Sequence, residues 1–224
     1  GEKAHIFYTE RYDPGKSLLV AQQRNLDPLK LVGVDSTDTA MHMPLKEEDR
    51  TFAKSFFEEN NLTGKRVIGF LPATTWVNKH WFNNGWSALA DIVAEKHNAI
   101  PLIFGSKADL KLADEICADA KHKPVVAAGK TTLKQAGALM EMCSVVVGVD
   151  TGLLHMSVAL DRPSIGLFGA SVWRCFLKKD NFIWIYKDFN CSPCLRHPTC
   201  KDVDCMKAIK PEDINEAITK LLKD

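Results

Sequence analysis

The stretch Val145-Val-Val-Gly-Val-Asp-Thr-Gly-Leu-Leu-His-Met-Ser-Val-Ala-Leu160 decides the fold, because its hydrophobic pattern changes period halfway. A β-branched apolar run, typical of a buried strand, is followed by apolar residues at helical spacing. Asp150, Thr151 and Gly152 lie where the pattern changes. A strand that leads directly into a helix is part of a βα unit. The stretch therefore predicts a parallel sheet with a polar turn at the carboxyl end of one strand.

The same alternation runs through most of the chain. Apolar runs typical of strands lie at 67–71, 100–104, 124–128 and 164–168, and helical patterns lie at 81–97, 110–120 and 133–142. Repeated βα units with short connections give a parallel sheet with helices on both faces. The predicted fold class is α/β with a Rossmann-like sheet.

The sequence divides into three parts. Residues 1–62 contain two candidate helices, at 16–31 and 47–60, but too few apolar positions for a core of their own. We interpret this part as the tail of a preceding domain plus a linker. Residues 63–210 carry the predicted sheet and a Cys-rich segment at 191–205. Residues 211–224 form a final amphipathic helix, with Pro211 suited to its first turn.

Composition excludes several classes of protein. The 224 residues are 46% hydrophobic and 25% charged, which is ordinary for a globular protein with a sizeable core. The net charge of +1 makes no electrostatic case for nucleic acid or for an anionic membrane. No apolar run approaches the roughly 18 residues of a membrane-spanning helix. We therefore expect at most peripheral membrane association.

Polar residues follow several of the predicted strands. Thr74, Thr75 and Lys79 follow the first strand, Lys130 and Thr131 follow the third, and Asp150-Thr-Gly152 follows the fourth. In open parallel sheets, ligands bind beyond the carboxyl ends of the strands. The sequence therefore predicts a site assembled from separate loops.

Asp150-Thr-Gly152 has three interpretations. An aspartic protease needs two such carboxylates, whereas the sequence has one Asp-Thr-Gly, and here it runs from a strand into a helix. As a βα turn, the segment would present backbone amides at a helix N-terminus, which suits an anion. Thr151 and His155 would share one face of that helix. Alternatively, Asp150 or Thr151 only caps the helix and His155 is a core histidine.

Lys79 favours the anion interpretation. With the hydroxyls of Thr74 and Thr75, its cation could hold a diphosphate through charge-assisted hydrogen bonds. The triphosphate-binding pattern Gly-x-x-x-x-Gly-Lys-Ser/Thr is absent from the sequence. Lys130 and Thr131 are equally consistent with a helix cap and with a ligand contact.

Three stretches together resemble a known family. They are Phe70-Leu-Pro-Ala-Thr-Thr-Trp-Val-Asn-Lys-His-Trp81, Ala128-Gly-Lys-Thr-Thr-Leu133 and Gly148-Val-Asp-Thr-Gly-Leu-Leu-His155. In this order and spacing they are similar to glycosyltransferase family 9, the lipopolysaccharide heptosyltransferases, over about residues 67–170. The first stretch is most similar to heptosyltransferase I.

The resemblance implies a GT-B enzyme with two Rossmann-like domains, of which this chain is mainly the C-terminal, donor-binding one. It implies transfer of heptose from ADP-L-glycero-D-manno-heptose with inversion and without a catalytic metal. The implied acceptor is a Kdo-bearing lipid A of the inner core, at the cytoplasmic face of the bacterial inner membrane. The catalytic base would be an Asp of the N-terminal domain, outside this chain. We therefore expect the chain to bind donor without catalysing transfer alone.

The resemblance also implies roles for individual residues. Thr74, Thr75 and Lys79 would contact phosphate or the transition state of the sugar, with Lys79 acting electrostatically. The amides of Thr151, Gly152 and Leu153 would bind the diphosphate. The remaining implied contacts are heptose hydroxyls for Asp150, the shape of the turn for His155, the border of the adenine for Lys130 and Thr131, and the ribose for Ser106, Lys107 or Asp109.

Four cysteines gather in fifteen residues: Cys191, Cys194, Cys200 and Cys205. A Cys-x-x-Cys pair followed by two further cysteines predicts a structural zinc site. A disulfide pair and free thiols are the alternatives. Four cysteine ligands would leave no open coordination position, so we expect no metal catalysis here.

Two other functions fit the same residues. One is a non-catalytic module that binds ADP or a nucleotide sugar. The other is a family member that uses a different ADP- or UDP-sugar.

Overall fold

The computed structural model describes residues 21–172, 179–195, 198 and 200–222, and the chain divides into two compact units. The described part of the first unit, residues 21–40, consists of helix α1 (Ala21–Leu26) and the 3₁₀ helix η2 (Asp27–Val32). Gly33 ends η2 in the left-handed conformation, at φ 77°. Of the helix predicted at 16–31, residues 16–20 lie outside the described part. From Asp27 the helix tightens to 3₁₀ geometry, where Pro28 cannot donate a backbone hydrogen bond.

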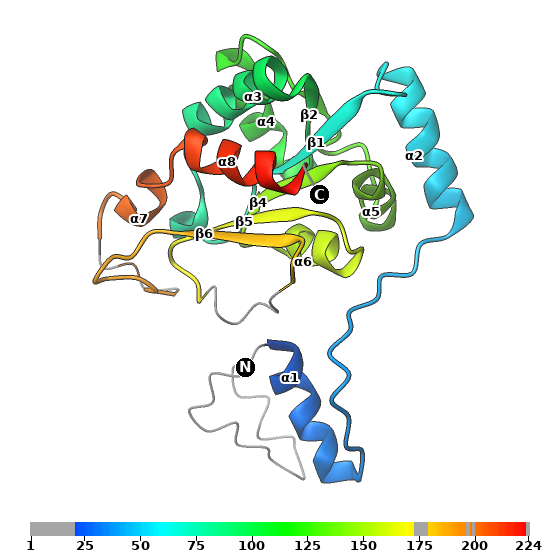
Figure 1. Cartoon of the computed structure of the whole chain (residues 1–224), viewed down its shortest axis with the longest axis vertical. Coiled ribbons are helices and arrows are strands. Elements are labelled where there is room, and N and C mark those ends of the chain that lie inside the picture. The colour runs from blue at the N-terminus through cyan, green and yellow to red at the C-terminus, as the bar shows by residue number, and fades with distance from the viewer. Residues whose placement is uncertain (1–20, 173–178, 196–197, 199, 223–224) are drawn as a thin grey trace. The chain divides into compact units, whose positions relative to one another are not determined.

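The second unit, residues 41–172 and 179–222, is built on a six-stranded sheet. All strand pairs are parallel, and their order is β3-β2-β1-β4-β5-β6. Figure 1 shows the strands lying side by side between the helices. The strands are β1 (Arg66–Leu71), β2 (Ala99–Ile103), β3 (Val125–Val126), β4 (Val145–Val149), β5 (Ser164–Phe168) and β6 (Phe182–Tyr186).

Burial explains why these segments are strands. Every residue of β4 and β5 is buried, as are residues 67–71 of β1. Runs of this kind are buried on both faces, as a parallel sheet covered by helices requires. Gly148 of β4 pairs with Leu71 of β1, and a Cβ at Gly148 would lie 2.8 Å from the Cβ of Leu71. A larger residue at position 148 would therefore push apart the two central strands.

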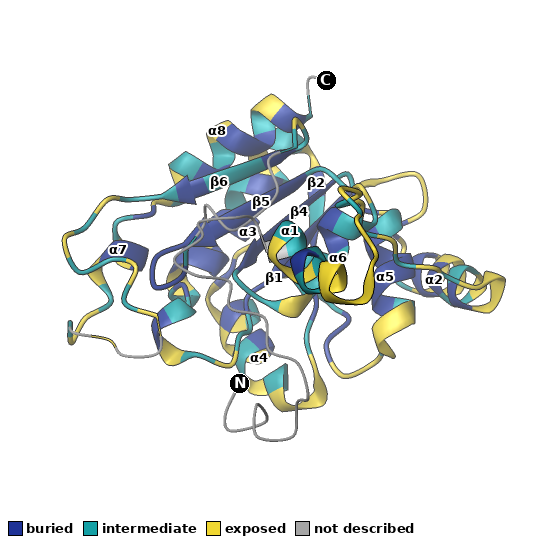
Figure 2. Cartoon of the chain, turned by 90° about the horizontal axis from the view of Figure 1, so that it is seen from below, coloured by how far each residue is buried: buried dark blue, intermediate teal, exposed yellow. Residues whose placement is uncertain are grey.

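Helices cover both faces of the sheet. Helices α3 (Asn83–His97), α4 (Leu110–Asp119) and α8 (Pro211–Leu221) pack together on one face. Helices α5 (Leu133–Glu141) and α6 (Gly152–Ala159) pack on the other, as right-handed crossovers require when strand order reverses. Figure 2 shows the central strands buried, the edge strand β6 partly so, and the helices exposed on their outer sides. The predicted α/β fold is confirmed.

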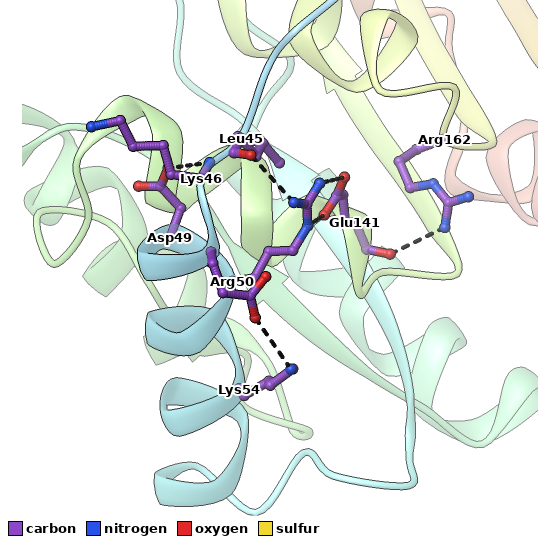
Figure 3. Close-up of polar contacts among 8 residues, drawn as sticks. Leu45, Lys46, Asp49, Arg50, Lys54, Glu141 and Arg162 are labelled. Carbon is purple, nitrogen blue, oxygen red and sulfur yellow. Dashed lines mark hydrogen bonds and ion pairs between the residues drawn. The ribbon is translucent and has the colours of Figure 1, made fainter.

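Helix α2 (Glu47–Glu59) belongs to the unit that carries the sheet. It buries Ala53, Phe56 and Phe57, and it packs against α5. Arg50 clamps the contact through two bonds to Glu141, Nε–Oε2 at 2.9 Å and Nη2–Oε1 at 3.1 Å (Figure 3). Residues 41–62, which the sequence pattern grouped with a preceding domain and linker, thus lie in the sheet unit. That residues 1–62 derive from an acceptor domain stays a prediction.

Two elements were not expected from the sequence. Strand β6 extends the sheet beyond β5, and the short helix α7 (Asp204–Lys207) follows the Cys-rich segment. β3 is shorter than predicted, with two residues in place of five. None of the helices described in the chain is long and apolar enough to cross a membrane.

Strand order creates one special position at the carboxyl edge. β1 leads through α3 to β2 on one side, whereas β4 leads through α6 to β5 on the other. The chain therefore departs in opposite directions from the neighbouring strands β1 and β4. Crevices at such a switch point are where doubly wound sheets bind ligands.

Candidate functional site

The loop after β1 is folded by its own polar groups. A ring nitrogen of His80, Nε2, lies 2.8 Å from the carbonyl oxygen of Thr74. The amide of Lys79 donates to the carbonyl of Trp76 at 3.0 Å, which closes the 3₁₀ turn η3 (Val77–Lys79). These bonds turn the loop back on itself, so that the side chains of Thr74 and Lys79 both reach Asp150 in the turn after β4.

The turn after β4 meets this loop at the switch point. The hydroxyl of Thr74 donates to the carbonyl of Asp150 at 3.1 Å. Thr151 is the N-cap residue of α6, but its hydroxyl makes no capping hydrogen bond. The first helical bonds are donated by Leu154 and His155, which places the amides of Gly152 and Leu153 ahead of the helical ladder. The turn thus presents backbone donors beside the side chains of the β1 loop.

Lys79 and Asp150 form the central ion pair. Lys79 Nζ lies 2.5 Å from Asp150 Oδ2, and each side chain is only 13% exposed. The ammonium group also lies 3.8 Å from the centroid of the Trp76 ring, so a cation–π contact adds to its orientation. The Lys79 side chain is therefore already ordered. Binding an anion there would cost little further side-chain conformational entropy.

His155 borders the same ion pair. Its Nε2 lies 3.8 Å from Asp150 Oδ1. Burial lowers the pKa of His155 below its ordinary 6.5; Asp150 opposes this and Lys79 adds to it. Burial thus favours the neutral imidazole, and the positive charge of this group is that of Lys79.

Two adjoining cavities open at this edge. The smaller, of about 270 Å³, is lined by Thr74, Thr75, Trp76, Lys79, Asp150, Thr151, Gly152 and His155. The larger, of about 500 Å³, shares Thr74, Thr75 and Thr151 with it. It continues along the ends of β2 and β3 to Gly105, Ser106, Ala108, Asp109, Thr131, Thr132, Leu133, Ala136 and Leu153. A charged compartment is thus joined to a longer, mostly uncharged one.

Most of the residues singled out from the sequence line these two cavities. Lys130 does not: it is exposed and absent from both linings. Of the three residues considered for the ribose, Ser106 and Asp109 line the larger cavity and Lys107 does not. Both the amide and the hydroxyl of Ser106 donate to Asp109 Oδ2 at 2.7 Å.

The apolar part of the lining was not predicted from the sequence. Trp76, Leu133 and Ala136 all face a cavity. Leu133 is 63% exposed. Its place at the end of the quoted stretch 128–133, directly after the polar end of the third strand, is the sequence signal that could have identified it. Trp76 lay within a quoted motif but had been given no role.

The geometry also separates the interpretations of Asp150-Thr-Gly152. The segment links a parallel strand to a helix, unlike the all-β setting of an aspartic protease. The Asp150 carboxylate pairs with Lys79, and the Thr151 hydroxyl makes no cap bond, so neither side chain serves mainly as a helix cap.

Fold and site together define the class. A doubly wound sheet carries, at its switch point, a compartment with a shielded Lys–Asp ion pair next to a cavity of about 500 Å³, where sheets of this kind bind their ligands. Residues 2–203 match the sequence profile described as glycosyltransferase family 9 (heptosyltransferase). The chain belongs to this family of glycosyltransferases.

Curated relatives agree with the family. Lipopolysaccharide heptosyltransferase 1 of Pseudomonas aeruginosa is 32% identical over 145 residues, covering 61% of this chain and 38% of the relative. Lipopolysaccharide heptosyltransferase 3 of Escherichia coli K12 is 27% identical over 207 residues, covering 90% of this chain and 59% of the relative. The chain thus spans less than two thirds of the length of these relatives. Types 1, 2 and 3 are all represented among the relatives, so the resemblance holds for the family.

Solved structures show the same fold. A family 9 glycosyltransferase from Veillonella parvula superposes with a TM-score of 0.82 at 22% identity, over 97% of this chain and 64% of that one. ADP-heptose lipopolysaccharide heptosyltransferase II of E. coli gives 0.66 at 24% identity, over 81% and 53%. E. coli heptosyltransferase WaaC, solved with ADP, gives 0.65 at 20% identity, over 96% and 61%.

Proposed function

We propose that this chain is the donor-binding part of an inverting heptosyltransferase that uses ADP-L-glycero-D-manno-heptose and builds the inner core of lipopolysaccharide. The observation that carries the proposal is the Lys79–Asp150 pair at the switch point, beside a cavity of about 500 Å³. A diphosphate needs a cation and backbone donors, and its nucleoside needs an adjoining long cavity. The family membership and the solved neighbour with ADP support the same donor.

The two cavities suggest how the donor lies. Adenine would pack near Leu133 and Ala136, with Thr131 at its border, and ribose hydroxyls would meet Ser106 or Asp109. The diphosphate would lie at the shared wall, where Thr74 and Thr75 face the start of α6. Lys130 would approach only from outside, because it is exposed.

The heptose would then lie in the smaller cavity. Asp150 and His155 line it, and both can exchange hydrogen bonds with sugar hydroxyls. Binding would draw Lys79 from the Asp150 carboxylate towards the diphosphate, which would free that carboxylate for the hydroxyls of the sugar. One ion pair would thus be exchanged for two contacts with the donor.

Transfer breaks the bond between the anomeric carbon and the diphosphate oxygen, and negative charge develops on the departing ADP. We assign stabilisation of that charge to Lys79 and to the amides of Thr151, Gly152 and Leu153, which are aimed before reaction begins. No cofactor is required in this scheme. The base that accepts the proton of the acceptor hydroxyl would come from the N-terminal domain of the GT-B enzyme. This chain should therefore bind donor without turnover.

The acceptor and location extend the proposal. The relatives act in lipopolysaccharide synthesis by name. We propose a Kdo-bearing lipid A acceptor at the cytoplasmic face of the inner membrane, reached by peripheral association.

Calorimetric titration with ADP, UDP and ADP-heptose tests the donor. We expect micromolar binding of ADP, weaker binding of UDP, and at least several-fold weaker binding of ADP by Lys79→Ala, because one charge-assisted contact is lost. Lys54→Ala is the matched control, since Lys54 is an exposed lysine on α2, remote from both cavity linings. Equal affinities for UDP and ADP, or a folded wild-type chain that binds no ADP, would reject the donor assignment.

A further inference from the structure

The Cys-rich segment carries no preformed metal site. Cys191, Cys194, Cys200 and Cys205 are free thiols. Across the described ranges, no three His, Cys, Asp or Glu side chains are placed to hold a metal ion. Zinc binding at these cysteines therefore stays a prediction.

The segment 41–46, where the chain enters the second unit, is extended along helix α5. Its odd-numbered residues, Met41, Met43 and Leu45, are half-buried, whereas the even-numbered ones are exposed. This alternation is typical of an extended chain with one side against a neighbour. We refer to residues 41–46 as the strap.

Both ends of α5 hold the strap through polar contacts. Near the start of the helix, Lys134 Nζ donates to the carbonyl of Pro44 at 3.0 Å. At the last residue of the helix, Glu141 holds the Arg50 guanidinium, and Arg50 Nη1 donates to the carbonyl of Leu45 at 3.2 Å (Figure 3). The strap is therefore fixed to the helix on either side of Met43.

Between these two contacts, the strap closes on a glycine. A Cβ at Gly137 would lie 3.1 Å from Met43 Cε and 3.2 Å from Leu45 Cδ2. Glycine is disfavoured inside a helix, so its presence here needs a reason. The reason is the close approach of Met43, which any larger side chain at position 137 would obstruct.

The neighbouring face of α5 lines the larger cavity through Leu133 and Ala136. At 100° per residue, these two side chains lie about a quarter of a turn from the face that holds the strap. Among the described elements, α5 packs mainly against α2 and α6, and α2 follows directly after the strap. The strap and α2 thus determine how closely α5 borders the cavity.

We propose that Met43 and Gly137 are positioning residues for the nucleoside end of the donor site. Met43, seated over Gly137, fixes α5 so that Leu133 and Ala136 lie where they can pack against adenine. Neither Met43 nor Gly137 lines the cavity, so both act through the helix. The inference rests on the proposed function, which places adenine against this helix.

Hydrogen exchange without any ligand tests the strap. Met43→Ala, or Gly137→Leu, should speed exchange of the amides of residues 136–141 about five-fold or more. Either variant covers the case in which the other does not fold. Met142→Ala is the matched control, because Met142 is an exposed methionine directly after the same helix. Unchanged exchange in both test variants overturns the strap.

ADP binding tests the positioning role. We expect Met43→Ala to bind ADP about five-fold more weakly than the wild type, and Met142→Ala to bind it equally well. Because coupling is reciprocal, saturating ADP should also slow exchange in the strap of the wild type at least two-fold. A residue with only a structural role would not give this protection. Equal affinity of Met43→Ala and the wild type, or a strap that ADP leaves unprotected, overturns the role.

The two measurements separate this inference from the proposed function. If exchange in α5 responds to Met43→Ala while the folded wild type binds no ADP, the donor assignment fails and the strap stands. If the wild type binds ADP while exchange in α5 ignores both variants, the strap fails and the donor assignment stands.

Discussion

At the scale of single residues, the site depends on a few charges held in a small volume. Lys79 and Asp150 are 13% exposed and 2.5 Å apart, whereas most ion pairs of the described residues are far more exposed. Surface pairs contribute little, but breaking a shielded pair leaves a poorly solvated charge. Under the proposed function, the diphosphate of the donor would replace Asp150 as the partner of Lys79.

Gly152 provides a test of close approach by the ligand. A Cβ at this position would meet no atom within 4 Å, so Gly152→Ala should leave the melting temperature unchanged or slightly raised. The same methyl group would enter the space at the start of α6, where the diphosphate is proposed to lie. We expect ADP affinity to fall about ten-fold, measured by calorimetry beside thermal melting. Unaltered affinity would place the diphosphate elsewhere.

The buried thiol of Cys143 should make the folded protein less stable at alkaline pH. Full burial raises the pKa of its thiol from 9.0 to about 12. The pKa of this thiol is higher in the folded protein than in the unfolded chain, so the protonated thiol stabilises the fold. That stabilisation is complete below about pH 9 and is lost as the pH rises towards 12. Urea unfolding at pH 8 and 10 should show the wild type losing about 1 kcal/mol more than Cys143→Ser. Equal losses in both proteins would contradict a raised pKa of Cys143.

At the scale of elements, most helices and strands could be predicted because their patterns are local. The run 145–149 is apolar throughout, and α5 and α8 carry their apolar residues at helical spacing. β6 was missed because the βα units predicted from the sequence ended at residue 168. β3 starts only at Val125 because Pro124 cannot donate a ladder bond, and it ends at Val126, ahead of the turn at Gly129, where φ is 71°.

Helix α2 offers a test of packing between elements. Arg50 bonds to Glu141 on α5 and to the carbonyl of Leu45, and the side chains of the ion pair are 41% and 31% exposed. Arg50→Ala should therefore lower the free energy of unfolding by more than Lys54→Ala does, and the difference should shrink at high salt. Lys54→Ala, on the same helix, should change it by about 0.5 kcal/mol or less. Equal effects of the two substitutions would exclude the clamp.

At the scale of the whole molecule, the second compact unit supplies every residue that lines the two cavities. All buried hydrophobic residues of the described chain begin at Ala53, and both cavities are lined by residues from Ala73 onward. Removing residues 1–40 should therefore change the melting temperature by no more than about 2 °C. ADP affinity should stay the same. Loss of cooperative melting, or of ADP binding, would show that the first unit contributes to folding or to the site.

The sequence by itself determined the order of strands and helices from β1 to β5, the final helix, the family, and most of the residues at the strand ends. Local periodicity and short motifs carry that information. Only the tertiary structure decided which strand ends meet, because strand order in a sheet depends on contacts between distant segments. It brought Lys79 to Asp150, 71 positions away, and Asn78 to Cys194, 116 positions away. It also left Lys130 outside the cavities, because that residue points into solvent beyond the end of β3.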